Sequence, residues 1–222
     1  ESAYRINKRA NIKIVPMGTD IKLFDPKKRD IKWRKQFGEN PKIILGVGRL
    51  IKWKGFEYLI KAFPVVLSKF PEAKLMIIGK GPEEEKLKKL AEKLGLHINR
   101  NIFFPEHFSS DRLPYIYASC DLVVSPSITI AATGEKEGQG NVALEARVSG
   151  TPVIASKSGG LVDTIDGKET GLLFKEKDYQ ELSRKIIEVF SDDNLRGNLS
   201  KNGLKHVREK YSWRITSQKF EE

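Results

Sequence analysis

The chain has 222 residues, 39% of them hydrophobic, and at this length one large domain can bury a core without disulfides or metals. It has a single cysteine, no run of about 20 apolar residues and no signal-peptide core at its start, which favours a soluble chain in a reducing, cytoplasmic compartment. The 40 basic and 29 acidic side chains give a net charge of +11, so nucleic acid, an anionic membrane surface and phosphorylated substrates are all candidate partners.

Short apolar runs alternate with segments of helical periodicity, a pattern typical of βα units on a parallel sheet. We therefore expect an α/β, Rossmann-like parallel sheet of about six strands with helices on both faces. The runs are nearly continuous, as in strands that are covered on both faces. A separate short strand is expected at 12–16. The six strands of the sheet are predicted at 43–47, 74–78, 101–104, 121–125, 152–156 and 171–174.

Helices are predicted between and after these strands. The first carries an apolar stripe that begins at Phe56, with a kink at Pro64, and the second begins near Pro82 and stops at Gly95. A further helix follows the glycine-rich loop near residue 140. The last three helices are predicted at 178–190, about 192–209 and 212–220.

The turn after the first strand, 46–55, carries Arg49 and Lys54 near its exit. In an open α/β sheet, ligands bind beyond the carboxyl ends of the strands, where two cations can hold a diphosphate through charge-assisted hydrogen bonds. The alternative is two solvated side chains on a loop. A dehydrogenase is disfavoured because Ile51 stands where the dinucleotide fingerprint has a third small residue, and no ribose-binding acid follows the second strand.

A second candidate site lies where a polar loop enters the helix near residue 140. The backbone N–H groups of Gly140, Asn141 and Val142 would face the strand ends and can bind phosphate oxygens or sugar hydroxyls. Glu137 precedes this turn and Glu145 lies about one turn inside the helix, so both carboxylates can accept hydrogen bonds from the hydroxyl pairs of a ribose or a hexose. The alternative for Glu145 is compensation of the helix dipole in the first turn.

Together these segments resemble the C-terminal, donor-binding half of a family 4 glycosyltransferase, a retaining class with the GT-B fold. The family's hallmark is two glutamates separated by seven residues, as Glu137 and Glu145 are. The loop at 131–136 is similar to that of bacterial exopolysaccharide members. The matching segments, in family order, are 14–24, 48–55, 77–82, 125–127, 137–145 and 150–156.

The resemblance implies a division of the chain and an activity. Residues 1–30 would be an interdomain lead-in, 31–210 the nucleotide-sugar donor-binding domain, and 211–222 the start of a helix that returns toward an N-terminal domain absent from these residues. With that domain, the protein would transfer a sugar from a nucleoside diphosphate, with retention of configuration, to a saccharide or lipid-linked acceptor. The product would belong to polysaccharide or glycoconjugate synthesis, and the fragment alone would bind donor and catalyse little.

The resemblance also implies roles for individual residues. Arg49 and Lys54 would bind the diphosphate and stabilise its charge as it leaves, Glu145 would bind the ribose, and Glu137 would bind the transferred sugar. Glu137 is expected to bind hydroxyls rather than to attack, so we expect departure and attack on the same face of the sugar. No metal or cofactor is expected. The other residues expected to contact the donor are Gly48, Gln139, Gly140, Asn141 and Val142, with Pro105, Glu106 and Phe108 beside the base, although Glu106 stands where the family usually has glycine.

Three alternatives stay open at this point. A GT-B phosphorylase or a nucleotide-sugar epimerase would share the fold, and a basic nucleic-acid-binding module would use the charge of +11. The sequence has no basic stripe with interleaved aromatic residues, so we expect no nucleic-acid partner. The excess charge can instead attract an anionic membrane, which would give peripheral contact at the cytoplasmic face.

Overall fold

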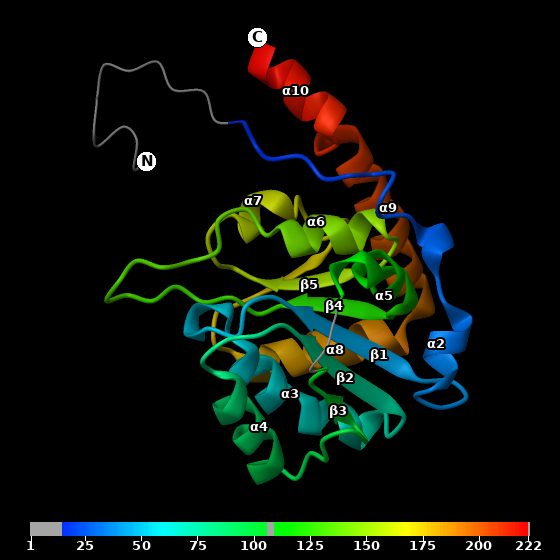
Figure 1. Cartoon of the computed structure of the whole chain (residues 1–222), viewed down its shortest axis with the longest axis vertical. Helices are drawn as coiled ribbons and strands as arrows, with labels where there is room; N and C mark the ends of the chain where they lie inside the picture. The colour runs from blue at the N-terminus through cyan, green and yellow to red at the C-terminus, as the bar shows by residue number, and fades with distance from the viewer. Residues whose placement is uncertain (1–14, 106–108, 222) are drawn as a thin grey trace.

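The computed structural model describes residues 15–105 and 109–221, and it confirms the predicted α/β class. One sheet of six parallel strands has the order β3-β2-β1-β4-β5-β6, with helices on both faces (Figure 1). The order reverses between β1 and β4, and in such sheets a crevice for ligands opens at this reversal. The strands are β1 (Lys42–Val47), β2 (Ala73–Ile78), β3 (Ile102–Phe103), β4 (Leu122–Ser125), β5 (Val153–Ser156) and β6 (Leu172–Phe174).

The helices form two layers. Figure 1 shows α3, α4 and α8 on one face of the sheet, and α5, α6 and α7 on the other. The α-helices are α2 (Ile31–Lys35), α3 (Phe56–Lys69), α4 (Glu84–Lys93), α5 (Leu113–Ser119), α6 (Asn141–Val148), α7 (Leu161–Thr164), α8 (Tyr179–Ser191), α9 (Asp193–Lys210) and α10 (Trp213–Glu221). Three short 3-10 helices are η1 (Pro26–Lys28), η2 (Lys52–Lys54) and η3 (Ser110–Arg112).

The apolar strands supply the core on both sides of the sheet. Successive side chains of a strand point to opposite faces, so Ile44 packs with the α3 layer whereas Ile43 and Leu45 pack with the α6 layer. All three side chains are fully buried. This two-sided burial explains why the six predicted strands read as continuous apolar runs.

Two local expectations need correction. No strand is present at Val15 and Pro16, the described part of the strand predicted at 12–16; residues 12–14 lie outside the described residues. Pro16 has no N–H to donate to a ladder, and its carbonyl oxygen instead accepts from the Thr216 hydroxyl at 3.3 Å. The helix expected to begin near Pro82 begins at Glu84, while Gly95, at a φ of +73°, follows its end as expected.

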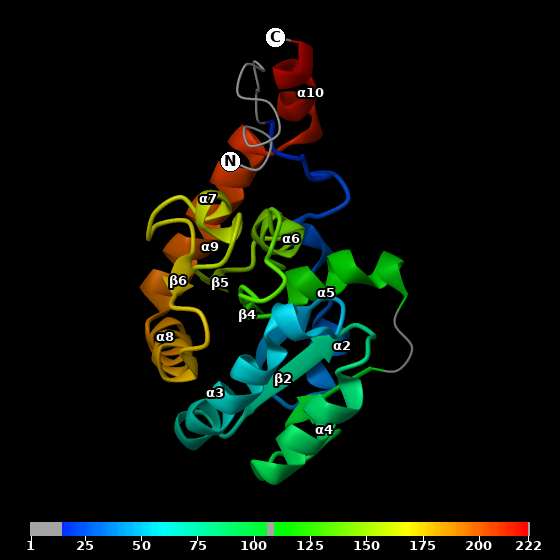
Figure 2. The same ribbon diagram turned by 90° about the vertical axis from the view of Figure 1, so that its left-hand side faces the viewer.

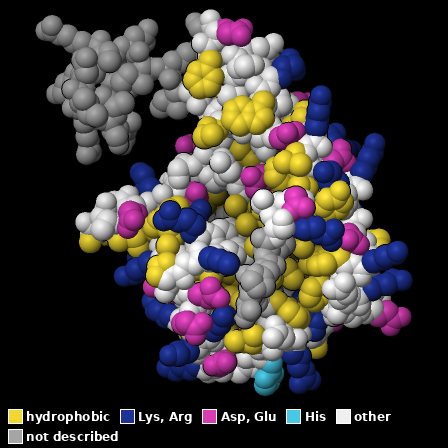
Figure 3. Space-filling view, viewed as in Figure 1, with side chains coloured by type: hydrophobic (Ala, Val, Ile, Leu, Met, Phe, Trp, Pro, Cys, Tyr) yellow, Lys and Arg dark blue, Asp and Glu magenta, His cyan; other side chains and the backbone are white. Residues whose placement is uncertain are grey.

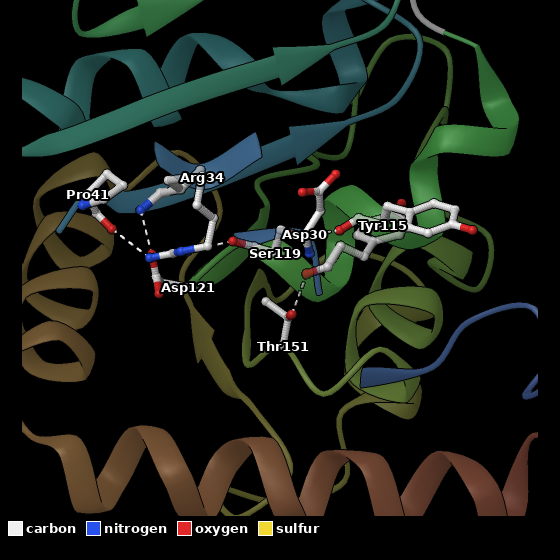
Figure 4. Close-up of polar contacts among 9 residues, drawn as sticks. Asp30, Arg34, Pro41, Tyr115, Ser119, Asp121 and Thr151 are labelled. Carbon is white, nitrogen blue, oxygen red and sulfur yellow. Dashed lines mark hydrogen bonds and ion pairs between the residues drawn. The ribbon is translucent and has the colours of Figure 1, made fainter. Parts of the chain in front are cut away.

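The segment before β1 packs onto the same domain. Arg34 of α2 donates hydrogen bonds to the carbonyl oxygens of Ser119 (2.5 Å) and Pro41 (2.8 Å) and to the Asp121 carboxylate (2.9 Å), as Figure 4 shows. The same Asp121 oxygen accepts from the backbone N–H of Ile43 at 2.8 Å. One guanidinium therefore connects α2, the start of β1 and the loop that leads into β4.

The last helix projects away from the sheet. Figures 1 and 2 show α10 beyond the end of α9, with the segment near Thr19 beside it, and the backbone N–H of Thr19 donates to the carbonyl of Tyr211 at 2.7 Å. Hydrophobic side chains are exposed at this end of the molecule (Figure 3): Met17, Trp213 and Phe220 are 53%, 51% and 71% exposed. Within the described ranges, no helix combines the length and apolarity that crossing a bilayer requires.

Candidate donor-binding site

Two glycine turns meet at the carboxyl ends of β1 and β2. The N–H of Gly48 donates to the carbonyl of Ile78 (3.0 Å), and the N–H of Leu50 donates to the carbonyl of Lys80 (2.9 Å). A Cβ atom on Gly79 would lie 1.8 Å from the carbonyl oxygen of Gly48, and the φ of Gly79 is +154°. Only glycine allows this close backbone approach, which holds the two turns against each other.

The turn after β1 also packs against the loop that follows β4. Gly55 ends η2 at a φ of +66°, and a Cβ atom there would lie 2.0 Å from the carbonyl oxygen of Pro126. The N–H of Ile128 donates to the carbonyl of Trp53 at 2.7 Å. These contacts place Lys54, the last residue of η2, over the segment that leads to Glu137.

Lys54 and Glu137 form an ion pair. The Lys54 Nζ lies 2.8 Å from Oε2 of Glu137, and the same oxygen accepts from the Ser127 hydroxyl at 2.8 Å. The Lys54 ammonium also lies 4.5 Å from the centre of the Trp53 ring. Glu137 is only 9% exposed, so its charge is compensated largely by these neighbours. The structure thus brings two of the predicted site residues into direct contact.

Glu145 lies on α6 and faces α5. The hydroxyl of the fully buried Tyr117 donates to its Oε2 at 3.0 Å. Burial raises the pKa of Glu145, and the Tyr117 hydrogen bond opposes that rise. The first turn of α6 contains no acidic residue, so Glu145 lies beyond the position at which it would compensate the helix dipole. That simpler alternative for Glu145 does not hold.

A buried arginine fixes the position of α6. The Arg147 guanidinium is fully buried and donates to the carbonyl oxygens of Ala143 (3.1 Å) and of Thr164 on α7 (2.8 Å), and it lies 3.3 Å from Nδ1 of His206 on α9. Burial lowers the pKa of Arg147 to about 10. The Arg147 side chain therefore links α6, the helix that carries Asn141 and Glu145, to α7 and α9.

The remaining predicted residues fall in several places. Gly140, at a φ of +81°, precedes α6, and both Gly140 and Val142 line a small pocket with Lys54 and Glu137. Asn141 and Arg49 are exposed. Gly48 and Pro105 line a second cavity, whereas Glu106 and Phe108 lie outside the described residues. Arg49 and Glu145 are both described by the structure, but neither lines the small pocket or the second cavity.

The second cavity has a volume of about 270 Å³ and opens at the ends of β1 and β2. Its described lining is mostly apolar and includes one charged residue, Lys80. Val47 lines both this cavity and the small pocket that contains Lys54 and Glu137. The two hollows are therefore adjacent. The cavity is lined by Val47, Gly48, Ile78, Gly79, Lys80, Pro105, Ser110 and Leu113.

Three contributions were not predicted from the sequence. Gln139 was predicted as a donor contact, but the pairing of its side chain with the backbone of Met17 was not: it accepts from the Met17 N–H at 2.6 Å and donates to the Met17 carbonyl at 2.7 Å. Ser127 belongs to a motif that the sequence did single out, but its hydrogen bond to Glu137 is visible only in three dimensions. Tyr117 lies on a short helix, α5, that was not predicted and carried no signal.

Comparison with known proteins agrees with this architecture. A family model described as "Glycosyl transferases group 1" matches residues 27–206. A GDP-mannose-dependent monoacylated alpha-(1-6)-phosphatidylinositol monomannoside mannosyltransferase of Corynebacterium glutamicum is 33% identical over 93% of this chain and 54% of its own length. The chain thus spans about half of that relative.

Two solved structures are also similar. The C-terminal domain of a glycosyl transferase group 1 family protein from Francisella tularensis superposes with a TM-score of 0.75 and 30% identity, covering 88% of this chain and 99% of that domain. An Anabaena protein in complex with UDP and glucose gives a TM-score of 0.81 and 27% identity, covering 94% of this chain and 55% of its own. The chain belongs to the glycosyl transferases of group 1, and its fold is that of a GT-B C-terminal domain.

Proposed function

We infer that this chain is the donor-binding domain of a retaining glycosyltransferase of family 4, and that it binds a nucleoside-diphosphate sugar. The observation that carries this proposal is the set of glycine turns at the strand-order reversal, which gathers Lys54, Glu137 and the start of α6 beside a cavity of about 270 Å³. A cation, a carboxylate and the N-terminus of a helix are groups that can bind a diphosphate and a sugar. The UDP and glucose bound by the Anabaena protein support this assignment.

The donor would lie across the two adjacent hollows. Its base would occupy the apolar cavity beside Gly48 and Pro105. The expected contacts of Glu106 and Phe108 with the base stay predictions, since both lie outside the described residues. The diphosphate would contact Arg49, Lys54 and the N–H groups of α6 from Asn141 onward. Glu145 would bind the ribose hydroxyls, and Glu137 those of the transferred sugar, supported by Gln139, Gly140 and Val142. The shared lining at Val47 makes this path continuous.

The proposed reaction breaks the bond between the anomeric carbon and the β-phosphate oxygen and forms one to an acceptor oxygen on the same face. The acceptor's proton passes to the leaving phosphate, which balances the charge. Attack on the face from which the phosphate departs retains the configuration. Arg49, Lys54 and the N-terminus of α6 stabilise the charge that develops on that phosphate. We propose that these cations do so with no metal or cofactor.

The acceptor site and the setting of the enzyme are also proposals. A saccharide or lipid-linked acceptor would bind to an N-terminal domain, and the exposed Met17, Trp213 and Phe220 give that domain an apolar surface to pack against. The mannosyltransferase from C. glutamicum, whose name specifies a phosphatidylinositol mannoside, supports a lipid-linked acceptor. We propose a cytoplasmic enzyme whose charge of +11 favours contact with an anionic membrane surface rather than with nucleic acid.

Calorimetric titration tests donor binding directly. The chain is titrated with UDP, GDP and ADP and with a sugar derivative of each, and one nucleotide is expected to bind in the range of about 10 μM to 1 mM. Arg49→Ala is expected to weaken that binding about tenfold or more, since a charge-assisted hydrogen bond to phosphate contributes about 1.5–3 kcal/mol. Glu145→Ala is expected to weaken it through loss of the ribose contact.

Lys52→Ala is the matched control, because Lys52 is an exposed cation on η2 close to Arg49 and Lys54 in sequence. It should leave the affinity within about twofold, the range expected for an exposed charge outside the site. Absence of binding to all three nucleotides and their sugars would overturn the proposal. Equal weakening by Lys52→Ala and Arg49→Ala would show a non-specific charge effect in place of a built site.

A further inference from the structure

We propose that the ion pair between Lys54 and Glu137 makes the site select nucleoside diphosphates that carry a sugar over bare nucleoside diphosphates, with Glu137 as the specificity-determining residue. The inference rests on the proposed donor-binding function and goes beyond it. A role in holding sugar hydroxyls concerns one ligand, whereas selection concerns the difference in affinity between the donor and the product that remains after transfer.

The Lys54–Glu137 ion pair is largely buried, and the two opposite charges neutralise each other. The side chains of Lys54 and Glu137 are 17% and 11% exposed, and their charged atoms lie 2.8 Å apart. Among the described residues that line this small pocket, Lys54 and Glu137 are the charged ones, and their charges cancel. The remaining lining residues are Val47, Phe56, Ser125, Pro126, Ser127, Gly140 and Val142.

Contacts with the neighbouring turn hold the backbone of Glu137 in place. Its carbonyl oxygen accepts from the N–H of Gly160 at 3.2 Å, and a Cβ atom on Gly159 would lie 1.9 Å from that same oxygen. The backbone of Glu137 is therefore enclosed by the turn after β5. On the side-chain end, the Ser127 hydroxyl at 2.8 Å is the donor that remains if Lys54 turns toward a phosphate.

A bare diphosphate that binds Lys54 breaks the pair. The Glu137 carboxylate is then left nearly buried with one neutral donor, and an uncompensated charge in such a setting is costly. A terminal phosphate also takes a second negative charge with a pKa of about 6, which the esterified phosphate of a nucleotide-sugar lacks. Bare diphosphate thus brings extra negative charge toward Glu137, and both effects oppose its binding.

A nucleotide-sugar avoids both penalties. Its hydroxyl groups can donate to the carboxylate that Lys54 has left, and its phosphate carries one negative charge fewer at neutral pH. Glu137 therefore couples occupancy of the phosphate position to occupancy of the sugar position. After transfer the sugar is gone and the phosphate charge has increased, so the same residue promotes departure of the product.

The test is the ratio of two dissociation constants, that of the bare nucleoside diphosphate divided by that of its sugar derivative, measured by calorimetry at pH 7.5. Glu137→Gln is expected to lower this ratio about tenfold, equivalent to 1.4 kcal/mol, with tighter binding of the bare diphosphate. Ser127→Ala keeps the carboxylate and removes its other donor, so it is expected to raise the ratio. The opposite signs distinguish selection from general damage to the site.

Glu135→Gln is the matched control, because it removes the same charge two residues away on an exposed loop. It should leave the ratio within about twofold, as for other exposed charges. An unchanged ratio in Glu137→Gln, or a loss of affinity equal for both ligands, would overturn the inference while the donor-binding function stands. If the unaltered chain binds neither ligand, the donor-binding function itself fails, and the inference fails with it.

Discussion

Glu145 carries its charge at a cost, because burial in the α5–α6 interface raises its pKa while the Tyr117 hydroxyl opposes that rise. A carboxyl whose pKa is higher in the folded than in the unfolded chain binds more protons when folded. Its ionisation therefore lowers stability at neutral pH, and this cost disappears as the pH falls through the folded pKa toward the ordinary value of 4.5. A ribose that donates two hydroxyls to the carboxylate would offset the same cost.

Tyr117→Phe isolates this effect. The substitution removes the donor from Glu145 and is expected to lower the free energy of unfolding by about 1.5–3 kcal/mol at pH 7.5, where the carboxylate is charged. The loss should be smaller at pH 4.5, because a pKa raised above this ordinary value leaves Glu145 more protonated in the folded chain than in the unfolded chain. Urea unfolding at the two pH values measures the difference. Tyr115→Phe, on the exposed side of the same helix, should change stability little at either pH, and an equal loss at both pH values for Tyr117→Phe would contradict the argument.

At the residue scale, sequence reasoning found Lys54 and Glu137 but not their contact. The two are far apart along the chain, and the ion pair depends on Gly55 fitting beneath Pro126, which no local pattern encodes. The positions of Glu106 and Phe108 lie outside the described residues. The roles assigned to the site residues stay predictions until binding is measured.

At the scale of elements, Gly197 in α9 has no structural requirement for glycine. It is exposed, its φ is not positive, and a Cβ atom there would meet nothing within 4 Å. Gly203, two turns further along, is different, because its Cβ would lie 3.1 Å from Arg147 Cδ and from the carbonyl of Thr170. One helix thus offers a permissive glycine and a constrained one.

Gly197→Ala is expected to raise the free energy of unfolding by about 0.5–1 kcal/mol, since alanine has the lower entropic cost in a helix interior. Gly203→Ala is expected to lower it, because the new methyl group crowds the buried Arg147. Thermal unfolding of both variants measures these two changes in the free energy of unfolding. A stabilisation in Gly203→Ala would show that Arg147 relaxes easily and does not fix α6.

The elements that could be located from the sequence are those with a clear pattern of apolar residues. All six strands of the sheet were placed within one or two residues, because two-sided burial makes each a continuous apolar run. The long helices α3, α8 and α9 were also predicted, and α3 and α8 carry amphipathic stripes. The helices α2, α5 and α7 were missed, since each has seven residues or fewer and too little length to show a helical period.

At the scale of the whole molecule, Arg34 connects the segment before β1 to the sheet. Arg34→Ala removes a guanidinium whose side chain is 12% exposed and leaves Asp121 without its cation. We expect a loss of about 2–4 kcal/mol, close to that for breaking a buried pair and reduced by the partial exposure. Urea unfolding measures this loss, with Lys35→Ala as the exposed control on the same helix; equal stability of the two variants would contradict the role of Arg34.

The single cysteine has a practical consequence at this same scale. Cys120 is 3% exposed just before β4, and burial raises its pKa well above the usual value, so its thiol is shielded and poorly nucleophilic. A cysteine introduced at an exposed position, such as Lys136 on the loop before Glu137, would therefore be the one reactive thiol on the chain. A maleimide dye attached there would report, through its fluorescence, whether an added nucleotide changes the surroundings of that loop.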